Sequence, residues 1–232
     1  MLSSEFKEET MSVAMIWGSP GSGKTVAATA PKDEKILLLC SDNSSVVLNM
    51  FDRKNVTVER VEHWIDPGDG KNYFMKQFED ALASGKYTLI VCDNLTDIKE
   101  LALLEIDEQG KIKDVRQVYQ AVYMAIKRLT RLAANAKCHV TFTAWDDAEE
   151  ITKADGTLAL RQSPNLPRKI LPQVLGLCNI VGQMAKAKDK EGVMRWFLVT
   201  EDSETRYGCK DQLYGRQSCM PEDLFKKPEV KK

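Results

Sequence analysis

A short glycine-rich segment lies between an apolar run and a helix-forming run near the start of the chain. It fits the pattern G-x-x-x-x-G-K-[ST], and its residues are Gly18, Ser19, Pro20, Gly21, Ser22, Gly23, Lys24 and Thr25. The apolar residues 12–17 predict a buried strand before it, and a helix is expected to start near Gly23. In this context the N–H groups of the turn and of the helix start form an anion-binding nest. A chance glycine-rich turn is the alternative, and the flanking strand and helix argue against it.

Apolar runs of strand length alternate with helical patterns over the first two thirds of the chain. Strands that are apolar on both faces and alternate with helices indicate a mostly parallel sheet with helices on each side. We therefore expect an α/β fold. The expected strands are residues 12–17, 35–40, 56–61, 87–92 and 138–144, and the expected helices are residues 73–83, 98–106 and 115–134.

The last third of the chain changes character and predicts two hairpins. Residues 149–161 carry Asp155-Gly156 between two short alternating runs, which is a hairpin signal. Residues 179–185 and 193–200 are joined by a polar, lysine-rich stretch and predict a second hairpin. We expect both hairpins to extend the sheet on one side as antiparallel strands, within a single domain.

Composition excludes several classes of protein. Lys and Arg total 33 against 34 Asp and Glu, so a globally basic nucleic-acid coat is excluded. No apolar run approaches the 18 to 20 or so residues that a membrane helix needs, and the first ten residues are acidic where a secretory signal is basic. The six cysteines form no C-x-x-C pair, which favours a reduced, cytoplasmic protein without a metal-binding cysteine cluster. The expected organisation is an N-terminal tail (1–11), one domain (12–220) and a basic flexible tail (221–232).

The glycine-rich segment also predicts a nucleotide and a metal. Lys24 can reach the β- and γ-phosphates of a nucleoside triphosphate such as ATP, and the Thr25 hydroxyl can bind Mg²⁺. A second ligand for Mg²⁺ is expected at the carboxyl end of another parallel strand, where Asp93 follows the apolar residues 87–92. The alternative role for Asp93 is to cap the helix that follows.

These motifs resemble those of the RecA-like P-loop ATPases, and most closely the phage AAA-type nucleotide-binding proteins that include single-strand-annealing recombinases. The resemblance covers residues 12–215, from the glycine-rich loop to the Lys210-Asp211 segment. It implies an ATP- and Mg²⁺-dependent ATPase fold in which strand 138–144 lies between the loop-bearing strand and the strand that ends in Asp93. It also implies a phage protein in the bacterial cytoplasm that forms a homo-oligomeric ring or filament.

The resemblance suggests roles for three further residues. Thr143 would be the polar sensor near the γ-phosphate, although it could equally be an ordinary strand end. Asp42 would be the catalytic carboxylate after the second strand, with one methylene less than the usual glutamate; its alternative role is to cap a helix over residues 44–50. Lys210, with Arg206 as a substitute, would reach the γ-phosphate of a neighbouring subunit.

A polar segment with several basic residues is the candidate contact to single-stranded DNA. In proteins of this kind the corresponding segment is a mobile loop, and contact with backbone phosphates would be independent of sequence and sensitive to salt. The alternative is a solvated hairpin with ordinary surface charges. The candidates are Lys153, Arg161, Arg168 and Lys169, and a second basic run comprises Lys186, Lys188 and Lys190.

The sequence therefore predicts an ATPase that acts on single-stranded DNA in phage recombination, annealing or replication, with phage single-strand-binding or replication proteins as further partners. One alternative is a nucleotide-gated adaptor or loader that binds ATP for assembly with little hydrolysis. The other is a small-molecule or nucleotide kinase, for which the segment 149–168 supplies few lid arginines. A signalling GTPase is disfavoured because no Asn-Lys-x-Asp motif occurs.

Overall fold

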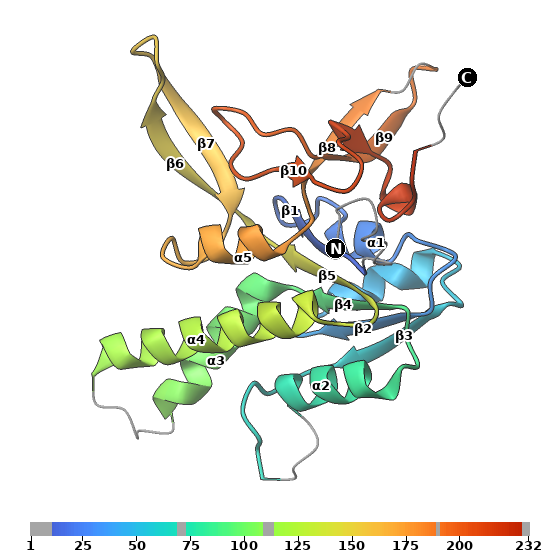
Figure 1. The fold of residues 1–232 in the computed structure, drawn as a ribbon, viewed down its shortest axis with the longest axis vertical. Helices are drawn as coiled ribbons and strands as arrows, with labels where there is room; N and C mark the ends of the chain where they lie inside the picture. Colours follow the sequence, from blue (N-terminus) through green and yellow to red (C-terminus); the bar gives the residue numbers. More distant parts are fainter. Residues whose placement is uncertain (1–10, 69–72, 109–113, 189–190, 229–232) are drawn as a thin grey trace, which may run out of the picture.

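The computed structural model describes residues 11–68, 73–108, 114–188 and 191–228. One large, mostly parallel sheet forms the middle of the molecule, and helices cover both of its faces (Figure 1). The strand order is β11-β9-β8-β1-β5-β4-β2-β3, with β10 paired to β8. The strands are β1 (Val13–Trp17), β2 (Ile36–Cys40), β3 (Val56–Arg60), β4 (Leu89–Asp93), β5 (His139–Ala144), β8 (Ile180–Lys188), β9 (Met194–Val199), β10 (Lys210–Asp211) and β11 (Ser218–Cys219).

The helices divide between the two faces of the sheet. Helices α2, α3, α4 and α5 pack on one face, while α1 and the 3₁₀ turn η2 lie on the other (Figure 1). Among the helices that the structure describes, none combines the length and the apolarity that a bilayer-spanning segment requires. The helical elements are α1 (Lys24–Ala28), η2 (Ser44–Met50), α2 (Phe74–Ser84), α3 (Leu95–Glu108), α4 (Val115–Ala134), α5 (Leu171–Leu177) and η3 (Pro221–Asp223).

Strand β1 shows why the sheet is covered on both faces. All five of its residues are buried, and they alternate between two apolar clusters. Val13, Met15 and Trp17 belong to the larger cluster, under α2–α5, and Ala14 and Ile16 belong to the smaller cluster, under α1. A strand buried on both faces is typical of a parallel sheet, so the α/β fold expected from the sequence is confirmed.

The order of the central strands matches the expectation from the resemblance. Strand β5 pairs in parallel with β1 on one side and with β4 on the other, with Thr141 opposite both Ala14 and Val91. The strand that carries the glycine-rich loop is thus separated by one strand from the strand that ends in Asp93. The carboxyl ends of all three strands meet at one edge of the sheet.

Both predicted hairpins form, but the first does not extend the sheet. Strands β6 (Asp146–Thr152) and β7 (Leu158–Pro164) form a two-stranded ribbon of their own that projects from the body (Figure 1), and β7 also makes a single β-bridge between Gln162 and Arg206. The expectation of one continuous antiparallel extension was wrong here. The ribbon has no fully apolar face to bury, because acidic side chains such as Asp147, Glu149 and Glu150 line β6. The second hairpin joins the sheet, because β8 pairs in parallel with β1 before β9 folds back on it.

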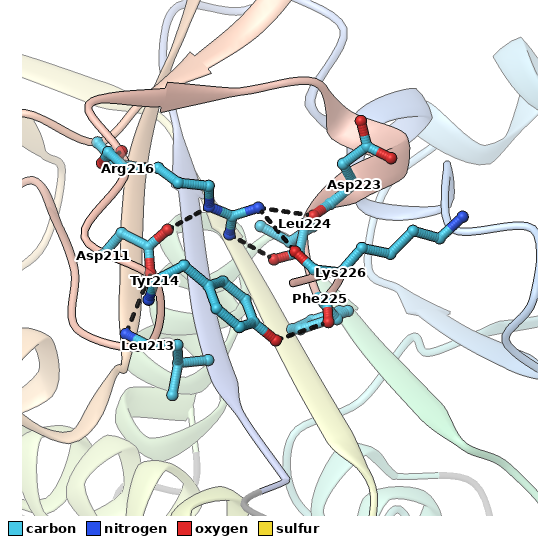
Figure 2. A network of polar contacts seen from close by, with 9 residues as sticks. Asp211, Leu213, Tyr214, Arg216, Asp223, Leu224, Phe225 and Lys226 are labelled. Carbon is cyan, nitrogen blue, oxygen red and sulfur yellow. Dashed lines mark hydrogen bonds and ion pairs between the residues drawn. The ribbon is translucent and has the colours of Figure 1, made fainter. Parts of the chain in front are cut away.

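A polar network closes the C-terminal part of the fold (Figure 2). The Asp211 carboxylate is buried, accepts hydrogen bonds from the N–H groups of Leu213 and Tyr214, and pairs with Arg216 Nε at 2.5 Å. The Arg216 guanidinium also donates to the carbonyl oxygens of Asp223 and Leu224, at 2.8 and 2.9 Å. We call residues 218–226 the C-terminal strap.

The strap is part of the packed fold. Its strand β11 pairs with β9, and the Leu224 side chain is fully buried in the cluster that contains α1. The Tyr214 hydroxyl donates to the Phe225 carbonyl at 2.8 Å, which adds a second anchor. The ordered fold thus continues beyond residue 220, where the sequence suggested that a flexible tail begins.

Candidate functional site

The glycine-rich loop connects β1 to α1 and curls at the carboxyl edge of the sheet. Gly21 and Gly23 have φ angles of 75° and 80°, a left-handed conformation in which other residues are strained. Helix α1 is only five residues long, because Pro31 prevents its continuation. The loop amides and Lys24, rather than a long helix dipole, are therefore the main groups available to a phosphate chain.

Lys24 lies inside the curl of the loop. Its Nζ donates to the carbonyl oxygens of Gly18 and Ser19, both at 2.8 Å, and the residue is only 7% exposed. Burial lowers the pKa of the Lys24 ammonium, while the nearby carboxylates of Asp93 and Asp146 oppose that shift. The ammonium group is thus held at the centre of the loop, where phosphate oxygens would replace the carbonyl oxygens as its partners.

Asp93 collects three hydroxyl groups from three other segments. Thr25 Oγ1 donates to its Oδ2 at 2.6 Å, Ser44 Oγ donates to the same oxygen at 2.7 Å, and Thr143 Oγ1 donates to Oδ1. Burial raises the pKa of Asp93, and the three hydroxyl hydrogen bonds act in the opposite direction. The structure therefore brings together Thr25, Asp93 and Thr143, which the sequence suggested separately.

This group of oxygen atoms fits Mg²⁺. Carboxylate and hydroxyl oxygens are the hard ligands that Mg²⁺ prefers, and it is usually held by one or two such groups together with substrate phosphates and water. Among the described residues, no group of three or more His, Cys, Asp or Glu side chains could hold a metal ion. Thr25 and Asp93 would hold the ion, which would neutralise negative charge on a bound triphosphate.

Asp42 lies at the wall of the cavity over the loop and makes two hydrogen bonds there. Its Oδ1 accepts a hydrogen bond from the N–H of Ser44, the first residue of the turn η2, at 2.7 Å, while the N-cap position of that turn is Asn43. Its Oδ2 accepts one from Asn94 Nδ2 at 3.3 Å, and the side chain lines the cavity over the loop. Asp42 is thus fixed at the cavity wall by the residue that follows Asp93.

A cavity of about 350 Å³ opens over the loop. Trp145 lines it, and its backbone N–H donates to Thr96 Oγ1 at 3.1 Å, which holds the backbone of this residue just after β5. Strand β5 thus contributes the Thr143 hydroxyl to the site, and the residue that follows the strand contributes to the cavity wall. The lining residues are Pro20, Gly21, Gly23, Lys24, Thr25, Val26, Asp42, Ser44, Val47, Asp93, Asn94 and Trp145.

Lys210 lies elsewhere in the chain. It pairs with Val181 of β8 and is not among the lining residues of this cavity. Burial lowers the pKa of the Lys210 ammonium. Arg206 lies closer to the carboxyl edge, because its Nε donates at 2.7 Å to Gln183, the strand partner of Trp17.

The four candidate DNA contacts are spread along the ribbon and the loop that follows it. Arg161 and Arg168 both bind the Glu149 carboxylate, at 2.6 and 2.7 Å, so their charge is partly neutralised. Lys153 begins the turn of the ribbon, and Lys169 is exposed just before α5. In the second basic run, Lys186 and Lys188 belong to β8, whereas Lys190 lies outside the described residues.

Sequence reasoning missed two polar residues of the site. Ser44 donates to Asp93, and the Asp146 carboxylate accepts a hydrogen bond from Ser19 Oγ in the loop at 2.8 Å. Both lie beyond the carboxyl ends of parallel strands, β2 and β5. Asp146 follows β5 by two residues, so its place at the edge where ligands collect was a usable signal. Ser44 lies in the turn η2, and its contact depends on how that turn folds back to the edge.

Comparisons with solved structures give distant similarities of shape. The flagellar accessory protein FlaH from Methanocaldococcus jannaschii has a TM-score of 0.46 and 11% identity, over 90% of this chain and 84% of that protein. A prototypical ATPase from the type III secretion system of pathogenic bacteria has a TM-score of 0.49 and 15% identity, over 76% of this chain and 52% of that one. The P4 protein from bacteriophage phi6, in complex with ADP, has a TM-score of 0.38 and 12% identity, over 82% of this chain and 60% of that one.

No curated protein matches the sequence. A family model does match, and it is described as an AAA domain; the match covers residues 11–211. That range includes the phosphate-binding loop, the Asp93 strand, β5 and the ribbon, which together make up the site described above. Because the match extends over most of the chain, this protein belongs to the AAA domain family.

Proposed function

We propose that this protein binds ATP with Mg²⁺ in the cavity over the loop and hydrolyses it. The observation that carries the proposal is the 2.6 Å contact between Thr25 and Asp93, which lie 68 residues apart in the chain and meet beside the buried Lys24. This combination supplies a cation for the β- and γ-phosphates and two oxygen ligands for the metal ion that bridges them.

Hydrolysis also needs a group that orients the attacking water. We assign this role to Asp42, because it lines the cavity and is held by Asn94 next to the metal-binding carboxylate. Thr143 would report the state of the γ-phosphate, since its hydroxyl is bonded to Asp93 from the neighbouring strand.

The adaptor or loader remains the second candidate, and one observation favours it. Both carboxylate oxygens of Asp42 already accept hydrogen bonds, from Ser44 and from Asn94. A carboxylate engaged in this way is a weaker partner for water. ATP would then be bound to fix an assembly and would be turned over slowly.

Single-stranded DNA is the polymer that we propose as the partner, in phage recombination, annealing or replication in the bacterial cytoplasm. The support is the polar β6–β7 ribbon, which projects from the body one residue after β5 and carries Lys153 in its turn (Figure 1), together with the exposed Lys169 in the loop before α5. A homo-oligomeric ring or filament would bring Lys210 or Arg206 of one subunit to the nucleotide of the next. Phage single-strand-binding or replication proteins would be further partners.

Calorimetry and phosphate release, each with and without Mg²⁺ and single-stranded DNA, test these proposals. Lys24→Ala should abolish binding of MgATP, whereas Lys32→Ala, which removes an exposed lysine outside the loop, should leave it unchanged. Stimulation of phosphate release by DNA that weakens as salt is raised would support the DNA partner. Light-scattering mass with and without ATP tests assembly. Equal heats of ATP binding for wild type and Lys24→Ala would refute the nucleotide site.

A further inference from the structure

A second hollow, of about 520 Å³, opens on the other side of the same loop. Gly21, Gly23, Val26 and Val47 line both hollows, so the two lie next to each other at the loop. Lys24, Asp42 and Asp93 give the first hollow its charged groups. The second is lined mainly by apolar side chains, including Met184 and Trp196, and its charged lining residues are Arg53, Arg195 and Glu222. Its volume lies within the range of roughly 300–1,000 Å³ typical of small-molecule sites.

The hairpin β8–β9 brings an aromatic ring against the phosphate loop. A Cβ atom added to Gly23 would lie 3.9 Å from Met184 Cε and 4.0 Å from Trp196 Cε2. Trp196 is 36% exposed, and the Lys186 ammonium lies 5.1 Å from the centroid of its ring. A large planar ring is thus held at the edge of the loop and remains accessible to a ligand.

The C-terminal strap forms another wall of this hollow through Met220 and Pro221. The strap is fixed on both sides, since β11 pairs with β9 ahead of these residues and Leu224 is fully buried after them. Arg216 holds the carbonyl oxygens of Asp223 and Leu224, as Figure 2 shows. The wall is therefore preformed.

One polar group in the hollow lacks a partner. Arg53 lines it, and its Nε is buried with no hydrogen-bond partner among the residues that the structure describes. The guanidinium lies 5.6 Å from the centroid of the Phe51 ring, which also lines the hollow. An N–H donor beside aromatic and thioether groups suits a flat heterocycle whose ring nitrogens accept hydrogen bonds.

We infer that this hollow binds the purine base of the nucleotide, with Trp196 and the strap as its specificity-determining walls. The inference rests on the proposed function, because the phosphates must occupy the neighbouring cavity for the base to reach this one. A purine covers more of an aromatic ring than a pyrimidine does, and both purines offer ring nitrogens to Arg53. Met220 and Pro221 bound the space from the strap, and Arg216 acts as a positioning residue through the strap.

The test compares MgATP, MgCTP and magnesium tripolyphosphate by calorimetry on the full chain. Wild type should bind MgATP more tightly than both other ligands. Trp196→Ala should lower the affinity for MgATP by roughly 5- to 100-fold, as expected for the loss of base stacking. The same change should leave the affinity for magnesium tripolyphosphate unchanged. Trp196→Phe should recover most of the lost affinity. Met194→Ala, an exposed apolar residue on the same strand and outside the hollow, is the matched control.

The outcomes separate this inference from the proposed function. If wild type binds tripolyphosphate and MgATP equally, the nucleotide site stands and the base hollow is refuted. If Trp196→Ala lowers the affinity for MgATP and for tripolyphosphate equally, the Trp196 ring stabilises the loop and does not stack on a base, and the inference is again refuted. If wild type binds neither ligand, the proposed function fails and the inference fails with it.

Discussion

Replacement of Arg216 by alanine should destabilise the protein severely. The Asp211 side chain is completely buried and that of Arg216 is 11% exposed, so the variant leaves a carboxylate unpaired in the interior. Loss of one partner of a buried ion pair typically costs about 3–5 kcal/mol. The carbonyl oxygens of Asp223 and Leu224 also lose charged donors. For a domain of this size, that loss corresponds to a fall in melting temperature of roughly 6–20 °C.

Urea denaturation followed by circular dichroism measures the change in the free energy of unfolding. Arg128→Ala is the matched control, because Arg128 pairs with Glu79 at 2.7 Å but its side chain is 68% exposed. An exposed pair of this kind contributes about 0–1 kcal/mol. The double variant Asp211→Asn/Arg216→Met should be more stable than Arg216→Ala, since it buries no unpaired charge. A loss below about 1 kcal/mol for Arg216→Ala would refute the reasoning.

Three further predictions concern the site and the packing around it. Asp42→Ala should lower phosphate release roughly 10²- to 10⁴-fold without weakening ATP binding; unchanged release would favour the adaptor. Burial raises the pKa of Asp93. The stabilisation that the protonated Asp93 gives is therefore complete below the unfolded-state pKa of about 3.9, and it is lost as pH rises through the folded-state pKa. Asp93→Asn should show a smaller fall in the free energy of unfolding over this pH range in urea titrations, and an identical pH dependence in both proteins would contradict this prediction. Gly182→Ala should lower the free energy of unfolding by about 1–3 kcal/mol in the same assay, because the added Cβ would lie 3.1 Å from Leu198 Cβ. An unchanged urea midpoint would contradict this and would show that β9 shifts to make room.

The sequence was sufficient for those parts of the site that depend on short motifs at strand ends. The loop pattern located Lys24 and Thr25, and the apolar strand before Asp93 located the carboxylate that Thr25 contacts. Both follow from local chemistry, since a buried strand followed by a polar residue places that residue at the edge of the sheet. The position of β5 between β1 and β4 came from the resemblance, because strand order is a property of long-range pairing.

Other parts could not be predicted because they depend on how loops return to the body. The Ser44 contact to Asp93 requires the 3₁₀ turn η2 to face the sheet edge, which the composition of the turn does not determine. The lysine-rich C-terminus concealed the buried Leu224, and the Asp211–Arg216 pair forms across an irregular loop. Pro31 is different, because it was a readable signal that α1 would be short.

The way in which the β6–β7 ribbon is attached has a mechanical consequence. Only Trp145 lies between the end of β5 and Asp146, the first residue of the ribbon. The Thr143 hydroxyl near the end of β5 donates to the Asp93 carboxylate, and the Asp146 carboxylate accepts a hydrogen bond from the Ser19 hydroxyl. The base of the ribbon therefore lies beside the loop and Asp93, whereas its two seven-residue strands carry the tip about 20 Å away. A rotation of about 10° at the base would move the tip by roughly 3–4 Å, a displacement the size of a side chain.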